Sequence, residues 1–364
     1  MELKVGLLGG GSWGTTVASL VSRNAPIKIW ARDSETVSDI NDNHCNSKYL
    51  PDIKLPPALT ATSEIGEAVS GADVLVMGIP SNNFRTVLEE AKQYLRPWVP
   101  VISLTKGLEL ATSKRMTEVI EEVLPGHPVG VLTGPNLARE IMAGQAAASV
   151  ISMEDEIIVK QLQQLFHSGL FRVYTNTDLL GCELGGVLKN IIAIAVGMGD
   201  GLGAGDNTRS ALITRGLAEI TRLGVAMGGK PETFSGLTGM GDMIATCTSP
   251  LSRNRHVGVE LGKGRHIDEI IDEMHMVAEG VKSAPTVIAL AKNTGSKCRS
   301  RRMFSKSPRQ PVCRSRLSWT GQPICRSRIR RGLKFRAFKG AETGEFEMKI
   351  ACRRGGYLPC LVGC

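Results

Sequence analysis

The sequence predicts an α/β protein with an N-terminal doubly wound sheet, then an all-α domain, then an irregular basic tail. Short apolar segments alternate with helical segments over the first half of the chain. Helical periods replace this alternation near residue 180, and arginine and cysteine accumulate after about residue 292. We therefore expect domains over residues 1–179 and 180–292, and a tail over 293–364.

The first strand is predicted at residues 4–8, "KVGLL", and a glycine-rich turn follows it. Gly9, Gly11 and Gly14 have the spacing G-x-G-x-x-G, and the helical stretch "TTVASLVSR" comes next. Glycines in this pattern allow a tight turn and let the backbone approach a pyrophosphate at the helix N-terminus. The pattern predicts a Rossmann-type domain that binds a dinucleotide. The alternative is a glycine-rich surface turn.

The second strand, "IKIWAR", ends beside the expected position of the adenosine ribose. Arg32 and Asp33 follow in that order. Arg32 suits the 2′-phosphate of NADP, whereas Asp33 suits the 2′-hydroxyl of NAD. Both residues could instead form an exposed ion pair, so the choice between NAD and NADP stays open.

Further strands are expected at 72–80, 99–107, 128–136, 146–152 and 171–177, with the helical segment 82–95 among them. Such alternation predicts a mainly parallel sheet, whose ligands bind beyond the carboxyl ends of the strands. The segments 80–82, 105–107 and 134–136 should therefore open on one crevice. Lys106 lies at one of these strand ends, although a plain surface lysine is the alternative.

The second half carries polar residues in apolar surroundings. Lys189 and Asn190 interrupt the stretch "ELGGVLKNIIAIAVG", and Asp242 lies in a glycine-rich turn before an apolar run. A buried ammonium ion is costly unless it is paired or has a chemical task. The alternative for Lys189 is a side chain that reaches the surface.

A helix start is predicted at Ser252, with Arg253, Asn254 and Arg255 in its first turn. Basic residues there oppose the helix dipole, so they favour an anion-binding site over a solvated basic turn.

Other classes of protein are less consistent with the sequence. We find no run of about 18 or more apolar residues, so no membrane span is predicted. No secretory signal is recognisable, and only three scattered cysteines precede the tail, so a cytoplasmic protein is expected. The histidines have no metal-ligand spacing, and we predict no metal site. No serine-triad pattern is present.

Taken together, the motifs resemble the bacterial-type NAD(P)-dependent glycerol-3-phosphate dehydrogenases over about residues 3–292. The stretches that carry this resemblance are "LLGGGSWGTTVA", "IPSNNFR", "TKGLE", "TGPNLAREI", "ELGGVLKNIIAIAVG", "GMGDMIATCTSPLSRNR" and "VAEGV". The resemblance implies reversible hydride transfer from NAD(P)H to dihydroxyacetone phosphate, giving sn-glycerol 3-phosphate for glycerophospholipid synthesis. It is compatible with a homodimer, and no nucleic-acid partner is expected.

The resemblance also implies roles for individual residues. Lys189 would donate and accept the proton, with Lys106 and Asp242 as further catalytic residues. The substrate would contact Lys106, Gly134, Asn136, Lys189, Asp242, Ser252, Arg253 and Asn254. The cofactor would contact Gly9, Gly11, Ser12, Trp13, Gly14, Arg32, Lys106, Ala138, Arg253, Val277 and Glu279. Asn136 departs from the family, which usually has serine there. Lys106 and Arg253 are expected to lower the pKa of Lys189, and Asp242 is expected to orient the site.

The tail differs from the rest of the chain. Residues 297–364 hold 18 basic and 3 acidic residues, whereas residues 1–296 carry a net charge of −6. Codons for residues 293–309 can be chosen so that another reading frame gives "YGIEMPIAEDVFKVTK", which looks like the ending the family would place after "ALAKN". We predict a frameshift near Asn293 that removes the terminal helices and uncovers apolar faces of residues 180–228 and 280–291. An arginine-rich nucleic-acid arm is the alternative.

Two alternatives to the predicted function remain. One is a related hydroxyacid or 6-phosphogluconate-type dehydrogenase, which also joins a Rossmann domain to a helical domain. The other is an inactive protein that binds a dinucleotide, or binds nucleic acid through its tail. The turn at residues 252–254 after Asp242 favours glycerol phosphate.

Overall fold

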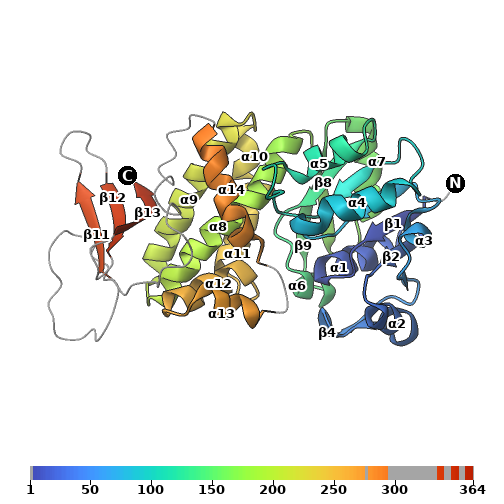
Figure 1. Cartoon of the computed structure of the whole chain (residues 1–364), viewed down its shortest axis with the longest axis horizontal. Helices are drawn as coiled ribbons and strands as arrows, with labels where there is room; N and C mark the ends of the chain where they lie inside the picture. Colours follow the sequence, from blue (N-terminus) through green and yellow to red (C-terminus); the bar gives the residue numbers. More distant parts are fainter. Residues whose placement is uncertain (1–2, 275–277, 294–333, 340–345, 352–356, 364) are drawn as a thin grey trace. The chain divides into compact units, whose positions relative to one another are not determined.

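The structure, a computed structural model, describes residues 3–274, 278–293, 334–339, 346–351 and 357–363 (Figure 1). The chain forms two compact units. The sheet unit contains residues 1–186 and 235–242, and the helical unit contains residues 187–234 and 243–364. Helix α8 (Leu179–Gly201) begins in the sheet unit and continues into the helical unit. Residues 235–242 thus belong with the first half of the chain although they follow α8 in sequence.

The sheet unit is built on an eight-stranded sheet of order β10-β9-β8-β7-β6-β1-β2-β5. Its strands are β1 (Val5–Leu8), β2 (Ile27–Trp30), β5 (Thr60–Thr62), β6 (Val74–Met77), β7 (Val101–Ser103), β8 (Val129–Thr133), β9 (Ala147–Met153) and β10 (Phe171–Asn176). Neighbouring strands of this sheet are parallel, apart from the antiparallel pair β8 and β9. The mainly parallel sheet predicted from the alternating pattern is therefore confirmed.

Helices cover both faces of this sheet, because successive strand residues point to opposite sides. Leu7 packs in one core cluster with side chains of α1 and α7, whereas Leu8 packs in another with side chains of α3, α4 and α5. The helices are α1 (Ser12–Val21), α2 (Ser34–Asn43), α3 (Ile65–Val69), α4 (Phe84–Lys92), α5 (Met116–Val123), α6 (Ala138–Met142) and α7 (Glu156–Phe166). The doubly wound architecture is confirmed.

Three short strands lie in a region where the apolar pattern predicts none. These are β5 at the sheet edge and the hairpin of β3 (Cys45–Asn46) and β4 (Leu50–Lys54). Only Leu50 of β4 is fully buried. Strands this short, with so few apolar residues, do not produce the apolar run on which the sequence prediction depends.

The helical unit packs α8 closely against α12 (Arg253–Gly262). A Cβ on Gly197 would lie 2.2 Å from the Arg255 carbonyl oxygen, and one on Gly258 would lie 2.1 Å from that of Ile194. Glycine therefore allows backbone contact between the two helices. The other helices are α9 (Asp206–Ala226), α10 (Pro231–Ser235), α11 (Asp242–Thr248), α13 (Ile267–Asp272) and α14 (Glu279–Asn293), and a π-helical turn (Leu237–Gly241) precedes α11.

Helix α8 is long and apolar enough to cross a membrane by length and composition alone. However, 89% of its most apolar window is buried inside the protein. It is therefore a core helix, as the sequence analysis expects for the stretch around Lys189.

The tail contains three described strands, β11 (Lys334–Lys339), β12 (Phe346–Ala351) and β13 (Tyr357–Gly363), which form an antiparallel sheet. This is regular structure in a tail for which the sequence predicts an irregular chain. The arginine-rich stretch that precedes β11 lies outside the described residues. On α14, the side chains of Ala284, Val287 and Ile288 are buried. The prediction that the apolar face of residues 280–291 is exposed is therefore wrong for these three positions.

Candidate active site

The glycine turn between β1 and α1 is closely packed. A Cβ on Gly14 would lie 2.0 Å from the Gly9 carbonyl oxygen, and Gly9 has φ +125°. A side chain at either position would therefore break the turn. Gly11, the N-cap of α1, has open space where its Cβ would be. Backbone N–H groups at the start of α1 can thus meet a pyrophosphate, which fits the predicted dinucleotide.

Two side chains in the first turn of α1 belong to the predicted cofactor site. Ser12 Oγ donates a hydrogen bond to the Tyr49 carbonyl oxygen at 2.9 Å. The Trp13 ring meets the Phe171 ring edge-on, with centroids 6.3 Å apart. The Trp13 indole N–H is buried and has no partner among the described residues. Such a buried donor is costly unless a ligand or water satisfies it.

The structure distinguishes Arg32 from Asp33. Asp33 caps α2 and accepts hydrogen bonds from the Glu35 N–H, the Thr36 hydroxyl and the Lys48 ammonium. The hydrogen bonds from Lys48 and Thr36 lower the pKa of Asp33. Arg32 is exposed and forms no ion pair within the described ranges. The carboxylate is therefore occupied locally, whereas the guanidinium can contact a ligand.

The predicted strand-end segments are joined by hydrogen bonds. Thr105 Oγ1 donates to the Ile79 carbonyl oxygen at 2.6 Å, which links the ends of β7 and β6. Lys106 Nζ donates to the Gly134 carbonyl oxygen at 2.7 Å, which links the ends of β7 and β8. The convergence of these segments at the carboxyl edge of the sheet is thus visible in the described contacts.

Lys106 also forms a largely buried ion pair with Asp242. The Nζ–Oδ2 distance is 2.7 Å, and the side chains of Lys106 and Asp242 are 17% and 2% exposed. Asp242 reaches this position because the turn before α11 belongs to the sheet unit. Two residues that are 136 positions apart in sequence are therefore brought together, as the sequence analysis predicts for one polar site.

Asn136 and Ala138 follow β8 in the same loop. Asn136 Nδ2 donates to Ser149 Oγ at 3.1 Å, and Ala138 begins α6. Gly134 has φ +140°, and a Cβ there would lie 3.2 Å from Ser149 Cα. The loop is therefore held tightly against β9.

Lys189 is buried within the helical unit. The residue is 5% exposed, and its ammonium donates to the hydroxyl of Thr246, which is itself buried. A lysine that reaches the surface, the alternative left by the sequence, is therefore excluded.

The predicted helix start at Ser252 is confirmed. Ser252 Oγ accepts from the Arg255 N–H as the N-cap of α12. Arg255 is paired with Asp200 at 2.8 Å, so Arg253 is the arginine of this turn that remains exposed. Desolvation by neighbouring atoms lowers the pKa of the Arg253 guanidinium, and the charge of Glu279 opposes this shift.

Asn254 connects three helices of the helical unit. Its Nδ2 donates to Asn190 Oδ1 at 3.0 Å, and its Oδ1 accepts from the Gly280 N–H at 3.0 Å. Asn190 directly follows Lys189, so this amide pair fixes α8 beside the lysine. Glu279 begins α14. Val277, the remaining predicted cofactor residue, lies outside the described residues.

A buried acid on α8 was not selected from the sequence. Glu183 is 3% exposed and accepts from the Arg115 guanidinium at 2.9 Å and from the Thr117 N–H at 3.1 Å. Burial raises the pKa of Glu183, and Arg115 opposes that shift. The sequence feature that indicates Glu183 is an acidic residue within an apolar run, six positions before Lys189. The cluster anchors α8 inside the sheet unit.

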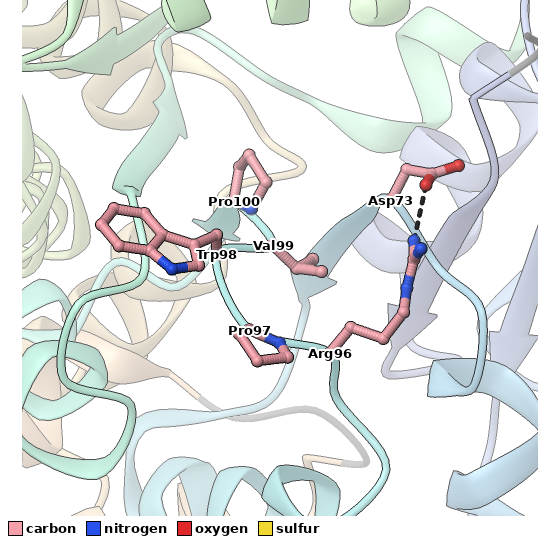
Figure 2. Close-up of a pocket in the computed structure, with 6 residues that line it drawn as sticks. All are labelled: Asp73, Arg96, Pro97, Trp98, Val99 and Pro100. Carbon is pink, nitrogen blue, oxygen red and sulfur yellow. Dashed lines mark hydrogen bonds and ion pairs between the residues drawn. The ribbon is translucent and has the colours of Figure 1, made fainter.

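A separate surface pocket lies at the opposite end of β7 (Figure 2). It has a volume of about 450 Å³ and is lined by Asp73, Arg96, Pro97, Trp98, Val99 and Pro100. Arg96 pairs with Asp73 at 2.6 Å. None of the predicted site residues lines this pocket, and ligands of such sheets bind at the carboxyl ends of the strands.

No cluster of acidic, histidine or cysteine residues able to hold a metal occurs in the described part of the chain.

Comparisons with known proteins agree with this geometry. The family model for the NAD-dependent glycerol-3-phosphate dehydrogenase N-terminus matches residues 4–159, and the model for the C-terminus matches residues 178–303. Glycerol-3-phosphate dehydrogenase [NAD(P)+] 2 of Sphingopyxis alaskensis is 82% identical over 295 residues, which cover 81% of this chain and 89% of that protein. The Mycobacterium tuberculosis relative, glycerol-3-phosphate dehydrogenase [NAD(P)+] 1, is 57% identical and covers 81% and 86%.

Solved structures show the same relationship. Glycerol-3-phosphate dehydrogenase from Coxiella burnetii has a TM-score of 0.78 at 36% identity, covering 81% of this chain and 91% of that chain. The Saccharomyces cerevisiae enzyme has a TM-score of 0.71 at 29% identity, covering 82% and 92%. With matches to both family models and this identity to curated relatives, the chain belongs to the NAD-dependent glycerol-3-phosphate dehydrogenase family.

Proposed function

We propose that the protein reduces dihydroxyacetone phosphate reversibly to sn-glycerol 3-phosphate and that Lys189 is its proton donor and acceptor. The main support is the burial of this ammonium on a core helix, with only 5% of the residue exposed. When bound, NAD(P)H supplies a hydride to the carbonyl carbon of the substrate. The carbonyl oxygen becomes an alkoxide, and Lys189 Nζ gives it a proton. In the reverse direction, the amine accepts the proton of the alcohol.

The remaining site residues would bind and orient the substrate. We assign the three-carbon part to Lys106, Gly134, Asn136, Lys189 and Asp242, and the phosphate to Ser252, Arg253 and Asn254. The ion pair of Lys106 with Asp242 and the hydrogen bond to Gly134 support this assignment, because they fix the lysine. The position of Arg253 in the first turn of α12 supports phosphate binding.

The cofactor would lie across the glycine turn. We assign it to Gly9, Gly11, Ser12, Trp13, Gly14, Arg32, Lys106, Ala138, Arg253, Val277 and Glu279. The closeness of Gly14 to Gly9 supports the part of this assignment that concerns the pyrophosphate. A cytoplasmic location, a homodimer and a role in phospholipid synthesis stay predictions.

Lys189→Met tests the proton role. We expect kcat for NADH oxidation with dihydroxyacetone phosphate to fall by about 10²–10⁴, the usual contribution of a positioned acid. NADH binding, followed by quenching of tryptophan fluorescence, should stay near the value of the unchanged protein. Lys160→Met is the matched control, because the Lys160 side chain is 68% exposed on α7. Near-normal turnover of Lys189→Met would overturn the assignment.

A further inference from the structure

A short hydrogen-bond chain connects the loop after β8 to the next strand. Ser149 lies on β9 and is fully buried. Its hydroxyl donates to the Thr133 carbonyl oxygen at 2.9 Å and accepts from Asn136 Nδ2 at 3.1 Å. Both partners belong to the segment that also contains Gly134, the carbonyl partner of Lys106.

The direction of this chain follows from donor and acceptor counting. A carbonyl oxygen can only accept, so the single hydroxyl proton of Ser149 is committed to Thr133. Toward Asn136 the hydroxyl can then only accept, which requires the amide nitrogen of Asn136 to face it. The amide oxygen must therefore point away from Ser149.

The other end of the amide lacks a partner. Asn136 Oδ1 is a buried atom that makes no hydrogen bond within the described ranges. Leaving a buried acceptor unsatisfied costs about 1–3 kcal/mol, so this oxygen, two residues after the Gly134 carbonyl that accepts from Lys106, favours a donor from outside the protein. A serine hydroxyl at this position could donate as well as accept, whereas this amide oxygen can only accept.

We propose that Ser149 is a positioning residue that holds Asn136 Oδ1 ready to accept the terminal hydroxyl of the three-carbon phosphate ligand. This inference rests on the function proposed above. The terminal hydroxymethyl group is chosen because dihydroxyacetone phosphate and glycerol 3-phosphate both carry it, so the contact serves both directions of the reaction. The contact gives preference for ligands with this hydroxyl over ligands without it.

The experiment compares dihydroxyacetone phosphate with hydroxyacetone phosphate, which has a methyl group in place of the hydroxymethyl group. In the unchanged protein we expect kcat/KM to favour dihydroxyacetone phosphate by about tenfold, the effect of one hydrogen bond. In Ser149→Ala the amide can turn, so this ratio should fall toward one, mainly through a higher KM for dihydroxyacetone phosphate. The Kd for NADH should not change.

Ser152→Ala is the matched control. Ser152 is equally buried on β9, and its hydroxyl donates to the Asn176 carbonyl oxygen at 2.9 Å. This variant loses the same group from the same strand and should keep the substrate ratio. If Ser149→Ala keeps the ratio as Ser152→Ala does, or weakens only NADH binding, the inference is wrong.

Asn136→Leu provides a second variant that removes the acceptor itself. In this variant the ratio of the kcat/KM values for the two substrates should fall toward one. Adding Ser149→Ala should change this ratio no further, because Ser149 acts only through Asn136. A further fall of this kcat/KM ratio in the double variant would contradict the positioning role of Ser149. Lys189→Met separates the two proposals: turnover that survives it overturns the proposed function, whereas an unchanged ratio in Ser149→Ala overturns only this inference.

Discussion

Arg32 and Asp33 are adjacent residues at the end of β2, but the protein uses them differently. The carboxylate of Asp33 is engaged by the start of α2 and by Lys48. A carboxylate with three donors gains little from a ribose hydroxyl. The exposed guanidinium of Arg32 carries the charge that suits a 2′-phosphate. From these surroundings we predict a preference for NADPH, at a position where the sequence left the choice open.

Arg32→Ala should raise the KM for NADPH by roughly ten- to a hundredfold, because a charged hydrogen bond contributes about 1.5–3 kcal/mol. The KM for NADH should change less than twofold, since NADH has no 2′-phosphate. Steady-state kinetics with both cofactors at saturating dihydroxyacetone phosphate measure this difference. Arg23→Ala, at a distant position after α1, serves as the control. An equal change for the two cofactors would contradict the prediction.

The sequence identifies single residues best where their type conflicts with their surroundings. Lys189 and Asp242 stand out as charged groups in apolar or glycine-rich segments, and the structure buries both. The orientation of the Asn136 amide could not be predicted in this way. It depends on Ser149, which lies in a separate strand and is one of several small residues there.

The elements of the sheet unit follow from local patterns, whereas their directions do not. Apolar runs predict β1, β6, β8 and β9 close to their observed bounds. The antiparallel direction of β9 is set by the path of the chain through α6, and the apolar content of a strand carries no sign of direction.

The turn between β1 and α1 is the element on which cofactor binding depends most directly. Gly14→Ala would place a methyl group 2.0 Å from the Gly9 carbonyl oxygen, so the turn must open and the N–H groups of α1 must move. We expect the Kd for NADH to rise at least tenfold, with a loss of stability of about 1–3 kcal/mol. Gly205→Ala is the control, because Gly205, the N-cap of α9, is not among the assigned cofactor residues and its Cβ would meet no atom within 4 Å. Fluorescence titration and thermal unfolding of both variants provide the measurements, and equal NADH affinity in the two would count against the role of Gly14.

The matches to relatives cover most of the chain but not the whole of it. The S. alaskensis relative matches 295 residues, and about a tenth of that protein has no counterpart here. With the codons chosen for residues 293–309, the alternative reading frame would place acidic and apolar residues after Asn293, where the present chain is rich in arginine. The frameshift is therefore still a prediction, with which the unmatched tenth of the relative is consistent.

Restoring one T near codon 293 should therefore stabilise the protein. The restored segment "YGIEMPIAEDVFKVTK" offers several large apolar side chains, and burying two of them would contribute about 3–6 kcal/mol. For a chain of this size the melting temperature should rise by on the order of 10 °C. A chain that ends at Asn293 is the control: it should melt close to the present chain, because the 18 basic residues of 297–364 are costly to bury. A restored chain that melts no higher than this control, or a gene whose codons do not permit the second frame, would exclude the frameshift.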